Sequence, residues 1–162
     1  MKRQFLLSIM LSSLLFGTNS EVDALFNLSI EELLEIEVTT ATGEKETTAE
    51  SISIVSVLTS SQLKQMGALN LYEAISYLPG VQVNETYMGF SVITFRGVTP
   101  GLFNNKALFM INGHPLHEKI FGASHFEFIP LDMIEKIEVV RSPASVLYGT
   151  NAMSGVINVI IK

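Results

Sequence analysis

The sequence contains no cysteine and no tryptophan among its 162 residues. Without cysteine, the chain forms no disulfide and offers no thiolate ligand to a metal ion. It also lacks a G-x-S-x-G elbow, a P-loop and a G-x-G-x-x-G stretch that opens a helix. Enzymatic activity is therefore not expected.

Basic residues are scarce as well, with 10 Lys and Arg against 16 Asp and Glu and a formal net charge of −6. Nucleic-acid binding requires grouped Lys or Arg to contact phosphates. Beyond the first three residues the chain has no such group. We therefore expect no nucleic-acid partner.

The first twenty residues differ from the rest. Lys2 and Arg3 precede an apolar stretch at 5–16, and small or polar residues follow at 17–20. This order is typical of a secretory signal peptide cleaved after Ser20, and it is too short to span a membrane. A buried N-terminal helix is the alternative. Cleavage would remove two basic and no acidic residues and so change the net charge from −6 to −8.

Residues 21–50 form a second region, with little apolar surface to bury. A capping box at Ser29 predicts a short helix at 28–34. The stretch 35–50, EIEVTTATGEKETTAE, is rich in Thr and Glu and predicts an extended, flexible segment. The folded domain is expected over 51–162.

From residue 51 onward, runs of β-branched residues alternate with capped helices. Ser60 or Ser61 caps a predicted helix at 62–66, and Asn70 caps another at 71–78. Asn112-Gly113 is a type I′ turn signal. Strands are predicted at 52–58, 81–83, 92–95, 107–111, 137–140 and 156–161, with one helical turn at 144–148. The expected fold class is α+β, a small mixed sheet with short helices and long loops.

Several strings resemble one known family. They are IEKIEVVRSPASVLYGTNAMSGVINVIIK at 134–162, LYEAISYLPGVQV at 71–83, VITFRG at 92–97 and MING at 110–113. Their order is similar to the plug domain of TonB-dependent outer-membrane receptors, over residues 38–162. Ser142 departs from the pattern because the family usually has Gly there, and a positive φ at this position would be costly for Ser.

The resemblance implies the gate of an outer-membrane transporter for a scarce, bulky nutrient such as a ferric siderophore, haem or cobalamin. The implied partners are a TonB-like energy-coupling protein and a 22-stranded barrel. That barrel needs well over ~200 residues for its strands alone, so it is not part of this chain. A stand-alone soluble periplasmic binding module is the alternative.

The family also has a short TonB box before the plug, which the partner captures by strand addition. The stretch 35–42 is the candidate here, because its β-branched residues suit strand pairing. A plain linker is the alternative. The residues expected to contact the partner are Glu35, Ile36, Glu37, Val38, Thr39 and Thr40.

Two arginines, Arg96 and Arg141, follow apolar strand ends, where a buried guanidinium needs a carboxylate. In the family the corresponding arginines face acidic residues of the barrel. Glu135 and Glu138 are candidate partners within the plug. Exposed strand-end arginines are the alternative.

If successive strands alternate in direction, the loops at 84–91 and 116–128 lie together at one end, and those at 99–105 and 142–155 lie at the other. Aromatic residues gathered on loops indicate a recognition surface. In the family, the first end faces the ligand, although some of these rings can instead pack beneath their own loops. The expected ligand contacts are Tyr87, Met88, Phe90, His117, Phe121, His125 and Phe126.

Three histidines, His114, His117 and His125, lie in one segment with Glu118. A spacing of three residues occurs in metal sites, but the segment is predicted to be irregular and the spacing fixes no geometry. Ordinary loop histidines are expected, with no resident metal or cofactor.

Overall fold

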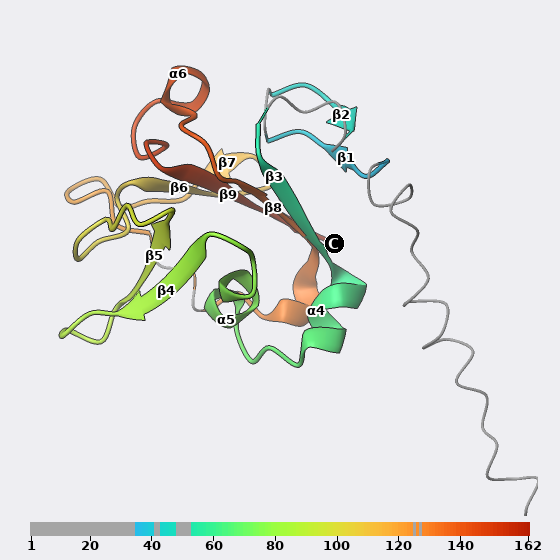
Figure 1. Ribbon diagram of the computed structural model, residues 1–162, viewed down its shortest axis with the longest axis horizontal. Coiled ribbons are helices and arrows are strands. Elements are labelled where there is room, and N and C mark those ends of the chain that lie inside the picture. Colours follow the sequence, from blue (N-terminus) through green and yellow to red (C-terminus); the bar gives the residue numbers. More distant parts are fainter. Residues whose placement is uncertain (1–34, 41–42, 48–52, 125, 127) are drawn as a thin grey trace, which may run out of the picture. The chain divides into compact units, whose positions relative to one another are not determined.

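The computed structural model describes residues 35–40, 43–47, 53–124, 126 and 128–162 (Figure 1). The signal peptide and the helix predicted at 28–34 lie outside the described residues. The described residues belong to one compact unit, Leu34–Lys162. The folded unit therefore begins earlier than residue 51, where the composition changes. None of the described helices is long and apolar enough to cross a membrane.

A five-stranded mixed sheet forms the centre of this unit (Figure 1). Its order is β3-β8-β9-β6-β7, in which β6 and β9 are parallel and the other neighbours are antiparallel. The bounds are β3 Val55–Thr59, β6 Ala107–Ile111, β7 His114–Pro115, β8 Ile134–Val140 and β9 Gly155–Ile161. The predicted α+β fold with a small mixed sheet is confirmed.

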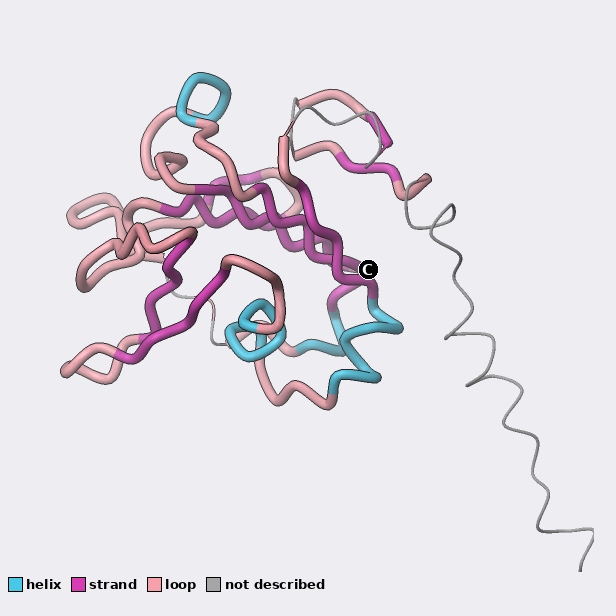
Figure 2. The backbone as a smooth tube through the Cα atoms, in the orientation of Figure 1, coloured by secondary structure: helices cyan, strands magenta, loops and turns pink. Residues whose placement is uncertain are grey.

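Two pairs of strands stand outside this sheet. The strands β4 (Val81–Glu85) and β5 (Ser91–Phe95) form an antiparallel ribbon. The short strands β1 (Glu37–Val38) and β2 (Glu46–Thr47) form a hairpin. Long loops join the strands, as Figure 2 shows in pink.

The helices are short, and α4 and α5 each begin after a residue whose side chain accepts from a free N–H group of the first turn. Helix α4 (Ser60–Met66) has Thr59 as N-cap in a capping box with Gln62, one residue before the predicted caps. Helix α5 (Leu71–Ser76) begins at Asn70, as predicted. A 3₁₀ turn η1 (Leu131–Met133) precedes β8, and α6 (Ser145–Tyr148) lies between β8 and β9.

Successive side chains of a strand point to opposite faces of the sheet, and here both faces carry apolar residues that are buried. Ile137, Val139 and Ile157 face the larger core, which includes residues of α4 and α5. Val140 and Val156 face a smaller core near α6. Figure 1 shows α4 and α5 on one side of the sheet, with α6 and the β1–β2 hairpin on the other.

Two local expectations concern turns. Asn112 and Gly113 have φ values of +48° and +78°, and they connect β6 to β7 as the turn signal predicts. Ser142 is absent from the residues with positive φ in the described part of the chain. Replacing the family's usual glycine by serine therefore carries no backbone strain at this position.

Candidate functional site

The segment at residues 37–40 is docked on the sheet beside β8 and β9. Val38 and Thr40 are 0% and 1% exposed. The backbone N–H groups of Thr39 and Thr40 donate to Oε2 of Glu138 at 3.2 and 3.1 Å. Lys136 Nζ donates to the Glu37 carbonyl oxygen at 2.6 Å. Three consecutive peptide groups, those joining residues 37 to 40, are thus hydrogen-bonded to the side chains of Lys136 and Glu138.

The receiving side chain, Glu138, is a fully buried carboxylate. Its Oε2 also accepts the Thr40 hydroxyl, and its Oε1 lies 2.8 Å from Lys136 Nζ. Burial alone would raise the pKa of Glu138, but Lys136, the Thr40 hydroxyl and the Thr39 amide outweigh that effect, so the pKa lies below 4.5. Glu138 is therefore held as the anion, the form that accepts these hydrogen bonds.

This arrangement differs from the flexible segment expected at 35–50, over the residues 35–40 and 43–47 that the structure describes. Glu37 and Val38 are paired in β1 with β2, and Thr39 and Thr40 are bonded to Glu138. Of the residues in the predicted partner set, Glu35 and Glu37 are exposed, and Ile36 and Thr39 are partly exposed. Burial of Val38 and the bonds to Glu138 each offset part of the entropy cost of ordering this polar segment.

Sequence reasoning overlooked Lys136 and Asn158 as parts of this site. Asn158 Nδ2 donates to Thr40 Oγ1 at 3.1 Å. The signal in the sequence is a single amide inside the apolar run at 156–161, on a strand predicted to be buried. A buried amide requires partners, and the sequence does not say that residue 40 supplies one.

The arginine pairing expected within the plug is wrong. Glu138 is engaged by Lys136 and Thr40, while Glu135 is exposed. Arg141 instead donates to Ser56 Oγ at 2.8 Å and to the Pro79 carbonyl oxygen. Arg96 is exposed, with φ of +48°. Among the described residues, no ion pair joins either arginine to Glu135 or Glu138.

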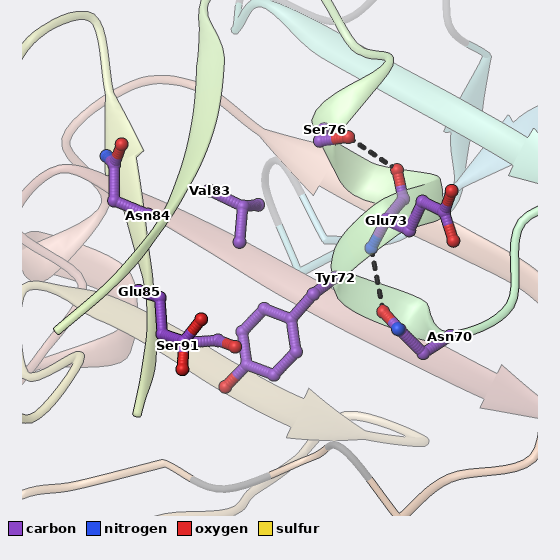
Figure 3. A pocket seen from close by; sticks show the side chains of 8 residues that line it. All are labelled: Asn70, Tyr72, Glu73, Ser76, Val83, Asn84, Glu85 and Ser91. Atoms are coloured by element: carbon purple, nitrogen blue, oxygen red, sulfur yellow. Dashed lines mark hydrogen bonds between the residues drawn. The ribbon is translucent and has the colours of Figure 1, made fainter. Parts of the chain in front are cut away.

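An open groove of ≈ 330 Å³ lies between α5 and the β4–β5 ribbon (Figure 3). The ring of Tyr72 lies between the α5 side chains and the hairpin residues Glu85 and Ser91. Glu73 accepts from the Leu69 amide at 2.8 Å, and its own amide donates to Asn70. The groove is polar and adjoins the turn at 86–90, which carries predicted ligand residues. Its lining residues are Asn70, Tyr72, Glu73, Ser76, Val83, Asn84, Glu85 and Ser91.

At the turn itself, Tyr87 and Met88 are 87% and 54% exposed, and Phe90 is partly buried. In the other predicted ligand loop, Phe121 is 57% exposed and His117 lies at a hollow of ≈ 280 Å³. These side chains are accessible, as a recognition surface requires.

The expected grouping of the loops is wrong. Phe121 stacks on Phe103 with ring centroids 4.8 Å apart. Asn151 Nδ2 donates to the Gly122 carbonyl oxygen at 2.9 Å. The loop at 116–124 therefore contacts both loops that were assigned to the opposite end. The cause is the short strand β7, which was not predicted: it pairs antiparallel with β6 and returns the chain toward the end of the sheet where β6 and β9 begin.

Phe126 also requires correction as a predicted ligand contact. It is 1% exposed and stacks between Tyr72 and Phe109, with centroid distances of 4.3 and 3.8 Å. It belongs to the larger core. Aromatic character alone did not distinguish this core residue from its exposed neighbours. His125 lies outside the described residues.

Glu118 organises the loop through backbone amides. Its carboxylate accepts from the amides of Ile120 at 2.8 Å, Phe121, and Ala123 at 3.3 Å. Over the part of the chain that the structure describes, no three His, Asp or Glu side chains come together as a metal site would require.

Comparison with known proteins places this architecture among receptors. The family model described as "TonB-dependent Receptor Plug Domain" matches residues 47–156. A vitamin B12 transporter, BtuB of Vibrio vulnificus, is 32% identical over 124 residues, which is 76% of this chain and 20% of that protein. The ferrioxamine B receptor of Salmonella typhimurium is 34% identical over 108 residues, 64% of this chain and 14% of that receptor.

Solved structures of receptors also resemble this chain. The siderophore receptor PirA of Acinetobacter baumannii aligns with a TM-score of 0.56 and 28% identity, covering 71% of this chain and 18% of that one. The ferric enterobactin receptor PfeA of Pseudomonas aeruginosa aligns with a TM-score of 0.53 and 27% identity, covering 67% and 17%. The chain thus spans about a fifth of the length of the relatives it matches.

Proposed function

Because the chain belongs to the TonB-dependent receptor plug-domain family, we propose that it is the gate of an outer-membrane transporter that imports a cobalamin or a ferric siderophore. The names of the matching transporter and receptors support this substrate class. The observation that carries the proposal is the docked segment at residues 37–40, which lies directly before the matched domain.

The gate works through release of that segment. A partner that adds the segment to its own sheet must bond to backbone N–H and C=O groups. In the docked state the amides of Thr39 and Thr40 are bonded to Glu138, and Val38 is buried. The segment is therefore closed to a TonB-like partner until it undocks. Ligand at the loops around Tyr87 and Phe121 favours the undocked state, because a ligand shifts a two-state equilibrium by its differential affinity.

Residues 1–20 direct export, so the gate resides in the outer membrane. A 22-stranded barrel surrounds it, and exposed Arg96 faces acidic residues of the barrel wall. Vitamin B12 and ferrioxamine B are the first ligands to test, because proteins named for them are among the relatives.

Two substitutions at one position test the energy-coupling role. Val38→Pro and Val38→Ala, each introduced into the transporter that contains this chain, both remove buried apolar contacts and weaken docking. Only proline also removes a backbone donor and fixes φ, which prevents strand addition. We expect Val38→Pro to reduce energy-dependent uptake of vitamin B12 or ferrioxamine B at least about tenfold, and Val38→Ala to retain it.

Ligand binding to whole cells at 0 °C, without uptake, is the control and should be equal in both variants. Equal uptake by Val38→Pro and Val38→Ala would mean that residues 35–42 are a plain linker. The TonB-like partner would then have to bind elsewhere.

A further inference from the structure

A buried polar pair lies on the face of the sheet that the docked segment covers. Glu138 of β8 and Asn158 of β9 are directly opposite each other in the strand register. They are 0% and 2% exposed. Their neighbours on this face include the apolar side chains Val140 and Val156. Two buried polar groups in such surroundings must find partners within the protein.

These partners form one directional chain of hydrogen bonds. The Gly113 amide donates to Asn158 Oδ1 at 2.9 Å, and Asn158 Nδ2 donates to Thr40 Oγ1 at 3.1 Å. The Thr40 hydroxyl donates to Glu138 Oε2, and Glu138 Oε1 lies 2.8 Å from Lys136 Nζ. The three bonds from Gly113 through Asn158 and Thr40 to Glu138 run in the same sense, so each polarises the next, and Lys136 supplies the opposite charge at the Glu138 end.

Thr40 is the link between Asn158 and Glu138. Its hydroxyl has one hydrogen, which goes to Glu138, and a lone pair, which receives the Asn158 amide. When Thr40 leaves, a buried carboxylate oxygen and a buried amide both lose a partner. Directly opposite residues of antiparallel strands have Cβ atoms about 5 Å apart. The Asn158 amide can therefore turn to Glu138 and leave Gly113.

The other end of the chain is the turn Asn112–Gly113. Asn112 is held independently, because its amide donates to the Val159 carbonyl oxygen and its Oδ1 accepts from the Ile161 amide, both at 2.9 Å. Gly113 depends on Asn158. The turn leads through β7 into the loop that carries Phe121, one of the accessible aromatic residues.

We propose that Asn158 couples docking of the segment at residues 37–40 to the Asn112–Gly113 turn. Withdrawing Thr40 releases the Gly113 amide, and displacing the turn weakens the hold on Thr40, because coupling between two sites is reciprocal. Only the biological meaning of this coupling rests on the proposed function: there, the Asn112–Gly113 turn and the partner-binding segment respond to each other through Asn158.

Thr40→Val tests the coupling, with Thr39→Val as matched control. Valine keeps the shape of threonine and removes the hydroxyl, and the contact of Thr39 with Glu138 uses its backbone amide instead. Amide hydrogen exchange is measured by NMR on the whole chain without ligand or partner. We expect Thr40→Val to speed exchange at Gly113 at least about tenfold, while Thr39→Val leaves it unchanged.

The Asn112 amide reports general loosening and should keep its protection in every variant. Thr40→Ser retains the hydroxyl and should restore protection of Gly113. Unchanged exchange at Gly113 in Thr40→Val would overturn the coupling, whether or not the Thr40 position undocks. Equal acceleration at Asn112 and Gly113 would overturn it too, since the effect would then be global.

The two proposals fail separately. If Val38→Pro and Val38→Ala support equal uptake while Gly113 responds to Thr40→Val, the partner-binding role fails and the coupling stands. If Gly113 does not respond but Val38→Pro abolishes uptake, the gate stands and the coupling through Asn158 fails.

Discussion

Glu138 is a buried charged side chain on which several hydrogen bonds and an ion pair converge. It is fully buried, yet it remains an anion because Lys136, the Thr40 hydroxyl and two backbone amides compensate its desolvation. Its charge also reaches Tyr148, whose pKa is raised by burial and by the nearby Glu138 carboxylate. Removing either the carboxylate or one of its donors leaves a buried polar group without a partner, so a single substitution in this cluster lowers the stability of the fold.

The lowered pKa of Glu138 makes stability depend on pH. The unfolded carboxyl binds its proton at higher pH than the folded one, so Glu138 stabilises the fold above its unfolded pKa of 4.5. That contribution is lost as the pH falls through the folded value. We expect Glu138→Gln to lower the free energy of unfolding at pH 7 by about 1–3 kcal/mol and to flatten its dependence on pH where the pH falls below 4.5.

Urea unfolding at each pH measures both effects. Glu135→Gln is the control, because Glu135 is an exposed carboxylate on the same strand. It should retain the wild-type pH dependence. A Glu138→Gln variant whose stability falls with pH as steeply as that of the wild type would show that another carboxylate is responsible.

At the scale of elements, the β4–β5 ribbon is completed by a side chain rather than by a third strand. Asn104 is 4% exposed, and its Oδ1 accepts from the Ile93 amide at 2.7 Å. Its Nδ2 donates to the Ser91 carbonyl oxygen at 2.7 Å and to the Tyr72 hydroxyl at 3.3 Å. The amide thus pairs with one edge of β5 as a neighbouring strand would. Asn104 has φ of +54°, a conformation that asparagine tolerates better than most residues.

Replacing this side chain should destabilise the fold through β5. We expect Asn104→Ala to cost about 2–4 kcal/mol, because several buried polar groups lose their partner at once. Asn104→Gly relieves any strain from positive φ and should be nearly as costly. Asn105→Ala, which removes one 3.3 Å bond to Phe121, should cost less than about 1 kcal/mol.

Thermal or urea unfolding of the three variants distinguishes the loss of hydrogen bonds from backbone strain as the cause of destabilisation. If Asn104→Gly were as stable as wild type, the hydrogen bonds to β5 would contribute nothing, and the cost of Asn104→Ala would be backbone strain alone.

At the scale of the whole unit, the aromatic rings form one buried stack and one stack at the surface. Phe126 packs between Tyr72 and Phe109 beneath the loop, while Phe121 packs on Phe103 at its surface. The groove of Figure 3 is bounded by Tyr72 as well. The buried stack of Tyr72, Phe126 and Phe109 therefore links the groove beside the ribbon to the loop that carries Phe126. The two phenylalanines of one segment accordingly have opposite expected roles.

Exchanging these rings for alanine tests that division. We expect Phe126→Ala to destabilise the fold by about 3–5 kcal/mol, since it removes a buried ring. Phe121→Ala should cost less than about 1 kcal/mol because the ring is 57% exposed. In the transporter that contains the chain, Phe121→Ala should weaken binding of vitamin B12 or ferrioxamine B about tenfold.

Val146→Ala is the control for binding, because Val146 of α6 is an apolar side chain that is 100% exposed outside the predicted ligand loops. Wild-type binding of both ligands by Phe121→Ala would remove the loop at 116–124 from the proposed ligand surface.

Local sequence was enough to determine most of the elements. The β-branched runs predict β8 and β9, Asn70 predicts the start of α5, and Asn112-Gly113 predicts the β6–β7 turn, because propensity, capping and turn geometry act over a few residues. The ordered strings of the family were sufficient to predict the plug fold.

Only the tertiary structure decided which distant residues meet. Periodicity marks Phe126 and Phe121 alike as aromatic loop residues, and it cannot reveal that one enters the core. The two-residue strand β7 is likewise too short for periodicity to mark, and by pairing antiparallel with β6 it brings the loop at 116–124 to the other end of the sheet. The bonds from Thr40 to Glu138 and Asn158 join residues 98 and 118 positions apart. A Thr- and Glu-rich segment has little apolar surface and reads as flexible, but a buried carboxylate that needs donors gives it one place to dock.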